Sequence, residues 1–99
     1  MFSWFDASEA QQLAIRLANE FSRAFPVSNK DKEDKKTLAK RDKATELVFA
    51  QAELFVRKTP LNIYKKARFG QAFQAHLAGL GYEIEFTRGL TRDVLLHLR

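Results

Sequence analysis

Cysteine is absent from the 99-residue sequence. Its absence excludes disulfide bonds, thiolate metal ligands and cysteine nucleophiles. A small domain without cross-links is held together by packing alone, which is more typical of a reducing compartment than of secretion. We therefore expect a cytoplasmic protein.

Long hydrophobic runs are also missing. The longest strongly apolar stretch is 47–52, far short of the ~20 residues that a membrane-spanning helix needs. Residues 1–6 carry neither the basic region nor the apolar segment of a signal peptide. We expect neither a membrane span nor a signal peptide.

Motifs for catalysis and metal binding are lacking as well. His76 and His97 are far apart in the sequence and do not form a pair at ligand spacing. No serine lies in the Gly-x-Ser-x-Gly setting of a nucleophile elbow. The glycines of 79–81 end a helix, whereas those of a phosphate-binding loop open one. We therefore expect no metal, no cofactor and no enzymatic activity.

What the sequence does contain is enough apolar material for one core. Hydrophobic residues make up 45% of the chain and include nine phenylalanines, which is not the composition of a disordered protein. The length is that of one domain, so we expect residues 1–99 to fold as a single unit.

The first predicted helix follows from spacing. Apolar residues recur every three or four positions from Ala10 to Phe25, which indicates one amphipathic helix of about five turns. Asp6 is placed to cap its first turn, with Glu9 reaching back. Pro26 ends the helix because it cannot donate the next hydrogen bond. Residues 27–29 are expected to form a loop.

The second predicted helix begins with charged residues and continues with apolar residues. The segment 30–36 consists of seven charged residues of mixed sign, typical of a frayed and solvated helix start. Between Thr45 and Val56 apolar side chains cover nearly the whole helix circumference, and a helix that is apolar all round is usually buried. We expect this second half to be the deepest element of the fold.

A third predicted helix runs from Pro60 to about Ala78. Thr59 suits the N-cap and Pro60 suits the first helical position, while the glycines of 79–81 end the helix. Gly70 lies inside the apolar pattern, where glycine weakens a helix. We expect its compensation to be the close approach of a neighbouring helix.

The last segment supports two interpretations. Residues 82–86 alternate like a strand, whereas apolar residues from Tyr82 to Leu98 also repeat every four positions, like a helix. We favour an irregular or helical turn at 82–88 and then a final helix capped by Thr91. The alternative is a strand that pairs with its counterpart in a second subunit. The predicted fold is all-α, a small antiparallel bundle of three to four helices.

Two groups of residues are candidate binding sites. The first is a basic cluster without acidic neighbours, which the turn after the second helix would bring to one end of the bundle; it suits phosphate or another anion, although a solvated helix face explains it too. Its members are Arg57, Lys58, Lys65, Lys66 and Arg68. The second group is aromatic and could form a partner interface or pack within its own domain. Its members are Phe2, Trp4, Phe5, Tyr82 and Phe86.

These features favour a small protein-interaction or regulatory module that acts by binding and not by catalysis. The expected partner is another protein or a second copy of the chain in a homodimer. The net charge of +5 and the sequence pI of about 9.7 keep a second hypothesis open, nucleic-acid binding through the cluster at 57–68.

Overall fold

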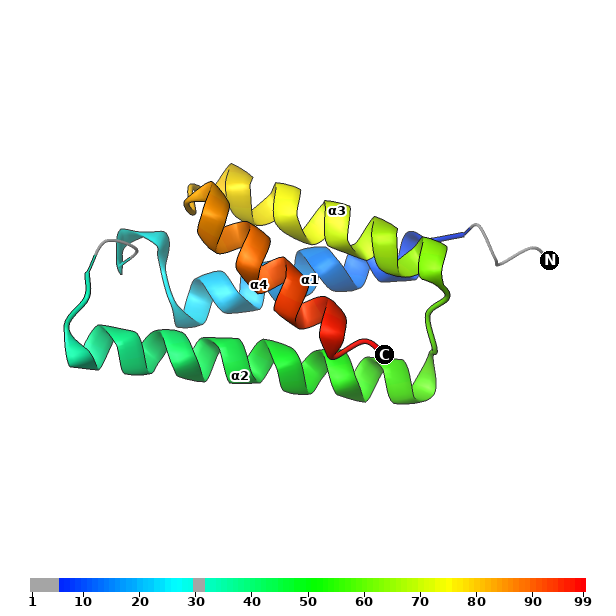
Figure 1. Ribbon diagram of the computed structural model, residues 1–99, viewed down its shortest axis with the longest axis horizontal. Coiled ribbons are helices and arrows are strands. Elements are labelled where there is room, and N and C mark those ends of the chain that lie inside the picture. The colour runs from blue at the N-terminus through cyan, green and yellow to red at the C-terminus, as the bar shows by residue number, and fades with distance from the viewer. Residues whose placement is uncertain (1–5, 30–31) are drawn as a thin grey trace.

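Four α-helices and one short 3-10 turn make up most of the chain in the computed structural model, which describes residues 6–29 and 32–99. Consecutive helices run in opposite directions, so the fold is an antiparallel all-α bundle, as the sequence predicts (Figure 1). No strand occurs within the described ranges. The elements in order are α1 (Ser8–Ala24), η1 (Val27–Asn29), α2 (Lys35–Lys58), α3 (Ile63–Leu80) and α4 (Ile84–Leu96).

The helices surround one hydrophobic core. α1 packs against α2 and α3, and α4 packs against the same two helices from the opposite side (Figure 1). The contact between α1 and α3 is the most extensive, whereas α2 and α4 touch only locally. The Cα radius of gyration is 13.5 Å, close to the ~13 Å expected for a compact chain of this length.

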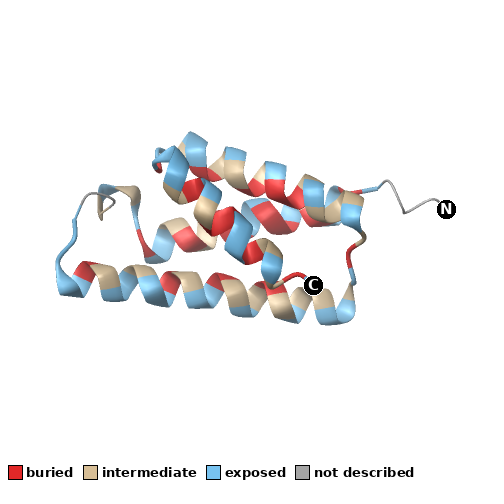
Figure 2. Cartoon of the chain, in the orientation of Figure 1, coloured by how far each residue is buried: buried red, intermediate tan, exposed pale blue. Residues whose placement is uncertain are grey.

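α1 is the most deeply buried helix. Its inner face alternates small and large apolar side chains at helical spacing, so neighbouring backbones approach closely while Leu and Phe fill the space between them. Figure 2 shows the buried stripe that this face contributes to the interior. Its buried residues are Ala10, Leu13, Ala14, Leu17, Ala18 and Phe21.

The prediction that the second half of α2 forms the centre of the fold is wrong. Only a narrow stripe of α2 is buried, and its members are Thr37, Ala44, Val48 and Ala52. Leu47 and Leu54 are 42% and 50% exposed, and Phe49 and Phe55 are half-buried. The reason is geometric: α1 and α4 cover two sides of α2, and no described element covers its outer side.

The ends of α1 differ slightly from the prediction. Asp6 accepts a hydrogen bond from the backbone N–H of Ser8 at 3.1 Å, yet the helix begins at Ser8 and Ala7 takes the N-cap place. This contact with Ser8 lowers the pKa of Asp6. The helix ends before Pro26, as expected, and the chain then forms the 3-10 turn η1 where a loop was predicted.

α2 begins at Lys35, so most of the mixed-charge segment precedes the helix. Asp34 is the N-cap, since its carboxylate accepts hydrogen bonds from the N–H of Thr37 at 3.2 Å and from its hydroxyl at 2.6 Å. These two bonds lower the pKa of Asp34. A charged cap at this end also complements the helix dipole.

The predicted start of α3 is wrong. Asn62 is the N-cap, and its side-chain oxygen accepts from Lys65 N–H at 2.8 Å. Thr59 instead ends α2 by donating its N–H to the Phe55 carbonyl at 2.9 Å. The predicted end of α3 is confirmed at Gly81, whose φ of 108° suits glycine.

α4, in contrast to α3, begins earlier in the sequence than predicted. Glu83 is its N-cap and accepts from Phe86 N–H at 2.9 Å, so the helix runs through Gly89 without interruption. Thr91 lies inside the helix and is buried, so the prediction that it caps a helix is wrong. The strand alternative at 82–86 is also wrong, because α4 begins at Ile84. α4 points Phe86, Leu90 and Val94 toward the core, and Tyr82 is buried just before its N-cap.

The glycines inside helices give a test of the packing. A Cβ added to Gly79 would meet nothing within 4 Å, and one added to Gly89 would meet only the Arg92 side chain at 3.9 Å. A Cβ at Gly70 would lie 3.3 Å from Leu95 Cδ1, which confirms the close approach of a neighbouring helix.

We therefore expect Gly79→Ala and Gly89→Ala each to raise the free energy of unfolding by about 0.5–1 kcal/mol. Gly70→Ala should gain less than either or lose stability, because Leu95 must move to admit the methyl group. Urea denaturation of the three variants measures this. An equal gain at all three positions would contradict the packing of α4 against α3 at Gly70.

Candidate functional site

The outer side of α2 carries a continuous exposed row of residues, which we call the outer stripe. Its residues follow one another at spacings of three or four and therefore lie along one side of the helix. All are exposed except Gln51, which is half-buried. The outer stripe consists of Lys36, Lys40, Lys43, Leu47, Gln51, Leu54 and Lys58.

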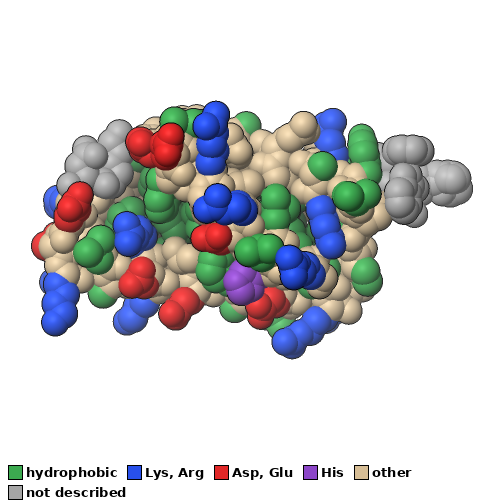
Figure 3. Space-filling view, in the orientation of Figure 1, with side chains coloured by type: hydrophobic (Ala, Val, Ile, Leu, Met, Phe, Trp, Pro, Cys, Tyr) green, Lys and Arg blue, Asp and Glu red, His purple; other side chains and the backbone are tan. Residues whose placement is uncertain are grey.

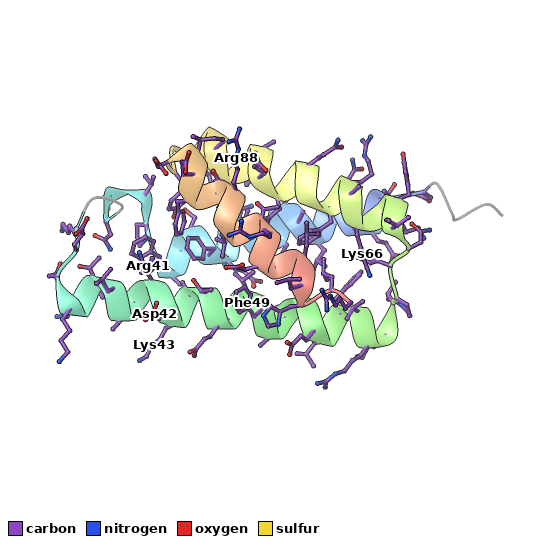
Figure 4. All side chains as sticks on the ribbon, in the orientation of Figure 1. Arg41, Asp42, Lys43, Phe49, Lys66 and Arg88 are labelled. Atoms are coloured by element: carbon purple, nitrogen blue, oxygen red, sulfur yellow. The ribbon has the colours of Figure 1, made fainter. Side chains whose placement is uncertain are left out.

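The outer stripe is apolar in the middle and basic at both ends. Leu47 and Leu54 are two helical turns apart, about 10 Å along the axis. Lys43 lies beyond one leucine and Lys58 beyond the other, and Figure 4 shows Lys43 on the edge of α2 away from the other helices. The stripe itself contains no acidic residue.

The acidic residues of α2 lie on a different side of the helix. Asp42, Glu46 and Glu53 share the side next to α4, and in Figure 3 acidic side chains lie along the part of α2 nearest the viewer. Lys and Arg side chains lie along the lower edge in the same view. The acidic residues of α2 therefore lie away from the outer stripe, while Lys35 and Arg57 share their side of the helix at spacings of seven and four.

A shallow groove of about 240 Å³ runs beside the outer stripe, between α1 and α2. Leu13 and Phe55 supply its apolar surface, and Glu9, Gln12 and Arg16 lie at its edges. Phe55 follows Gln51 by one helical turn, so the groove and the outer stripe form adjoining parts of one surface.

The predicted basic cluster lies at the end of the molecule where α2 leads into α3 (Figure 1). Arg57 and Lys58 are exposed on the last turn of α2. Lys65, Lys66 and Arg68 are half-buried on the first turns of α3, where Lys66 points toward α2 (Figure 4). The Arg68 Nε is buried without a hydrogen-bond partner among the described residues. Because Lys66 and Arg68 are about 200° apart around the helix, they face different sides.

The predicted aromatic interface is only partly within the described chain. Phe2, Trp4 and Phe5 lie outside the described residues. Tyr82 is 4% exposed and donates its hydroxyl hydrogen to the Phe25 carbonyl. Phe86 is half-buried, with its ring centroid 5.9 Å from that of Tyr82.

Tyr82 and Phe86 meet at the floor of a hollow of about 530 Å³ between α4 and the first half of α2. Phe25 completes this aromatic floor. Figure 3 shows hydrophobic side chains within the depression. Four charged side chains form the rim, namely Lys32, Glu33, Arg41 and Glu83.

Arg41 is the residue of this region that sequence reasoning missed. It is half-buried, points from α2 toward α4 (Figure 4), and lines both this hollow and a second one of about 280 Å³. Its guanidinium forms no hydrogen bond or ion pair with another described residue. In the sequence Arg41 is one of many basic residues in a charged segment, and no local pattern sets it apart.

Both histidines contact residues of neighbouring helices. The His97 ring stacks on Phe49 with centroids 4.0 Å apart, and its Nδ1 lies 2.5 Å from Glu53 Oε2, which links α4 to α2. His76 Nε2 lies 2.8 Å from Asn19 Oδ1 and links α3 to α1. These pairs are far apart in the sequence, so spacing gave no signal for them.

Comparison with known proteins gave no match: no family model, no curated protein and no solved structure is significantly similar to this chain. Within the described ranges, no three His, Asp or Glu side chains come together to hold a metal ion. None of the described helices is long and apolar enough to cross a membrane.

Tyr82 gives a test of the floor of the hollow. Burial raises its pKa above the ordinary value of 10.0, and a hydrogen bond with Ser22 opposes this rise only in part. The stability gained from the neutral phenol is therefore complete below pH 10 and is lost as pH rises through the folded-state pKa.

We expect Tyr82→Phe to cost about 1 kcal/mol near neutral pH, because the Phe25 carbonyl loses its donor. The free energy of unfolding of the variant should also fall less than that of the wild type as the pH rises above 10, because the variant has no phenol to ionise. Urea denaturation between neutral pH and pH 11 measures both effects. Parallel loss of stability in the two proteins at high pH would contradict the burial of the phenol.

Proposed function

We propose that this chain is a protein-interaction module that acts by binding, through the outer stripe of α2, a helical segment of another protein with acidic side chains. The observation that carries the proposal is the exposed Leu47 and Leu54 pair between lysines, on a side of α2 that no described element covers. The two leucines lie in one row beside the groove that Leu13 and Phe55 line, and a contiguous apolar surface of this kind is typical of a site that receives a partner.

The geometry favours a helix as the partner. Leu47 and Leu54 are seven residues apart, which matches apolar side chains placed two turns apart on a second helix. The groove beside them, with Leu13 and Phe55 on its apolar surface, adjoins the stripe and could receive side chains of the same partner. Together they offer one elongated apolar surface.

The charge favours an acidic partner over a second copy of this chain. An antiparallel pair of outer stripes would place Lys43 of one copy near Lys58 of the other, and like charges repel. Acidic residues flanking the apolar positions of another protein would instead attract these lysines and orient the partner. Homodimer formation through this side is therefore the weaker alternative.

One observation supports binding without catalysis. Among the described residues, the groups whose pKa clearly departs from its ordinary value are Asp6, Asp34 and Tyr82, and each departure comes from a helix-end contact or from core burial. Strongly perturbed groups in a cleft are the usual mark of an active site. The lack of cysteine is the basis for proposing a cytoplasmic location.

The proposal can be tested with a synthetic amphipathic helical peptide that carries leucines two turns apart and glutamates on either side. We expect the double variant Leu47→Gln, Leu54→Gln to weaken peptide binding by about tenfold, because the exposed leucines would be buried on binding. Lys40→Glu with Lys43→Glu should weaken it as well, increasingly so at low salt. Fluorescence anisotropy of the labelled peptide measures both.

Matched controls make the outcome specific. Ile15 and Leu96 are 42% and 51% exposed on other helices, so Ile15→Gln and Leu96→Gln should leave peptide binding unchanged. Because all four residues are exposed, the melting temperature should stay close to that of the wild type. Peptide binding that is absent, or that survives the double leucine variant, would contradict the proposal.

Nucleic-acid binding through Arg57, Lys58 and the basic residues of α3 is the competing function. It predicts binding to duplex DNA or RNA that weakens steeply with salt. Lys65→Glu with Lys66→Glu should abolish that binding, whereas the leucine double variant should leave it intact. Such a result, together with no peptide binding, would replace the proposed function with this one.

A further inference from the structure

We propose that the hollow between α4 and the first half of α2 binds a small amphipathic anion, a compound with one carboxylate, sulfonate or phosphate group on an apolar and preferably aromatic body. This site is distinct from the outer stripe, which lies on another side of α2. The proposal rests on the aromatic floor of the hollow together with Arg41, whose guanidinium has no partner among the described residues.

The floor fits an apolar body. Phe25, Tyr82 and Phe86 lie side by side there, and the Tyr82 and Phe86 ring centroids are 5.9 Å apart with an interplanar angle of 34°. Phe25 and Tyr82 are 3% and 4% exposed and form the bottom of the hollow, while the half-buried Phe86 presents part of its ring to a further aromatic group. A volume of about 530 Å³ lies within the range of small-molecule sites.

Arg41 sets the sign of the ligand charge. A half-buried guanidinium loses part of its hydration, and Arg41 has no hydrogen-bond or ion-pair partner among the described residues to replace that hydration. A carboxylate, sulfonate or phosphate would supply the partner with the geometry that guanidinium groups prefer.

The other charged residues decide which side of Arg41 the anion takes. Each hollow carries two exposed acidic side chains, Glu33 and Glu83 in the larger one and Glu85 and Asp93 in the smaller one. Only the 530 Å³ hollow adds a second basic residue, Lys32, beside Arg41. There the positive N-terminal end of α4 also offsets part of the charge of Glu83. The anion therefore belongs on the aromatic side.

The probe for this site is 8-anilinonaphthalene-1-sulfonate, which joins two aromatic groups to one sulfonate and fluoresces when bound. We expect saturable binding to the wild type, and Arg41→Gln should weaken it by about tenfold through loss of a charge-assisted contact. Arg57→Gln is the matched control, an exposed arginine of the same helix, and should leave the affinity unchanged.

A second probe separates the anion from the apolar body. N-phenyl-1-naphthylamine lacks the sulfonate, so it should bind more weakly than the sulfonate and equally well to wild type and Arg41→Gln. Amide chemical-shift changes on titration should gather at Leu38, Arg41 and Glu83–Phe86. Cooperative urea unfolding of Arg41→Gln and Arg57→Gln would show that the fluorescence of the sulfonate probe does not report a loosened core.

The outcomes are decisive. Absence of saturable sulfonate binding, equal affinity in wild type and Arg41→Gln, or shift changes centred away from the hollow would each overturn the proposal. Loss of affinity in Arg41→Gln alone, with shifts at the hollow and intact unfolding, would establish it. None of these outcomes depends on the outer stripe, so the proposed function stands or falls separately.

Discussion

The burial of one face of α1 is the interaction on which the rest of the bundle depends. Ala10, Ala14 and Ala18 are each at most 1% exposed and let the backbones of neighbouring helices approach, while Leu17 and Phe21 are fully buried between the helices. Close packing of this kind is the main favourable term in a domain of this size that has no cross-links. α2 and α3 are both positioned by contact with this face, and α4 then spans the two.

The exposed surfaces follow from that arrangement. α2 is the longest helix, but it can turn only one side to α1 and one to the shorter α4, so Leu47 and Leu54 remain in contact with water. The first half of α2 also extends beyond its closest contact with α4, and this leaves the aromatic hollow beside Arg41 open. The outer stripe thus results from the side of α2 that no described element covers, and the hollow from the part of α2 that extends beyond α4.

Local chemistry made part of this fold predictable. Apolar spacing identified the helices, Pro26 and Gly81 marked two of their ends, and Gly70 indicated a close helix contact. Choices between competing local signals failed: Asn62 and Glu83 cap helices where Thr59 and Thr91 were expected.

The burial of side chains on α2 and the contacts of the two histidines could not be predicted from the sequence, because both depend on which distant helix covers a given side. The same holds for the candidate sites. The basic residues were visible as charges, whereas the hollow, its aromatic floor and the lack of a partner for Arg41 among the described residues arise only when three helices meet.

Native-state hydrogen exchange tests the central claim most directly. It should show the amides from Leu13 to Phe21 exchanging only through global unfolding, and the first turns of α2 exchanging at lower free energy. Faster exchange in α1 than in the stretch 45–56 would contradict the account.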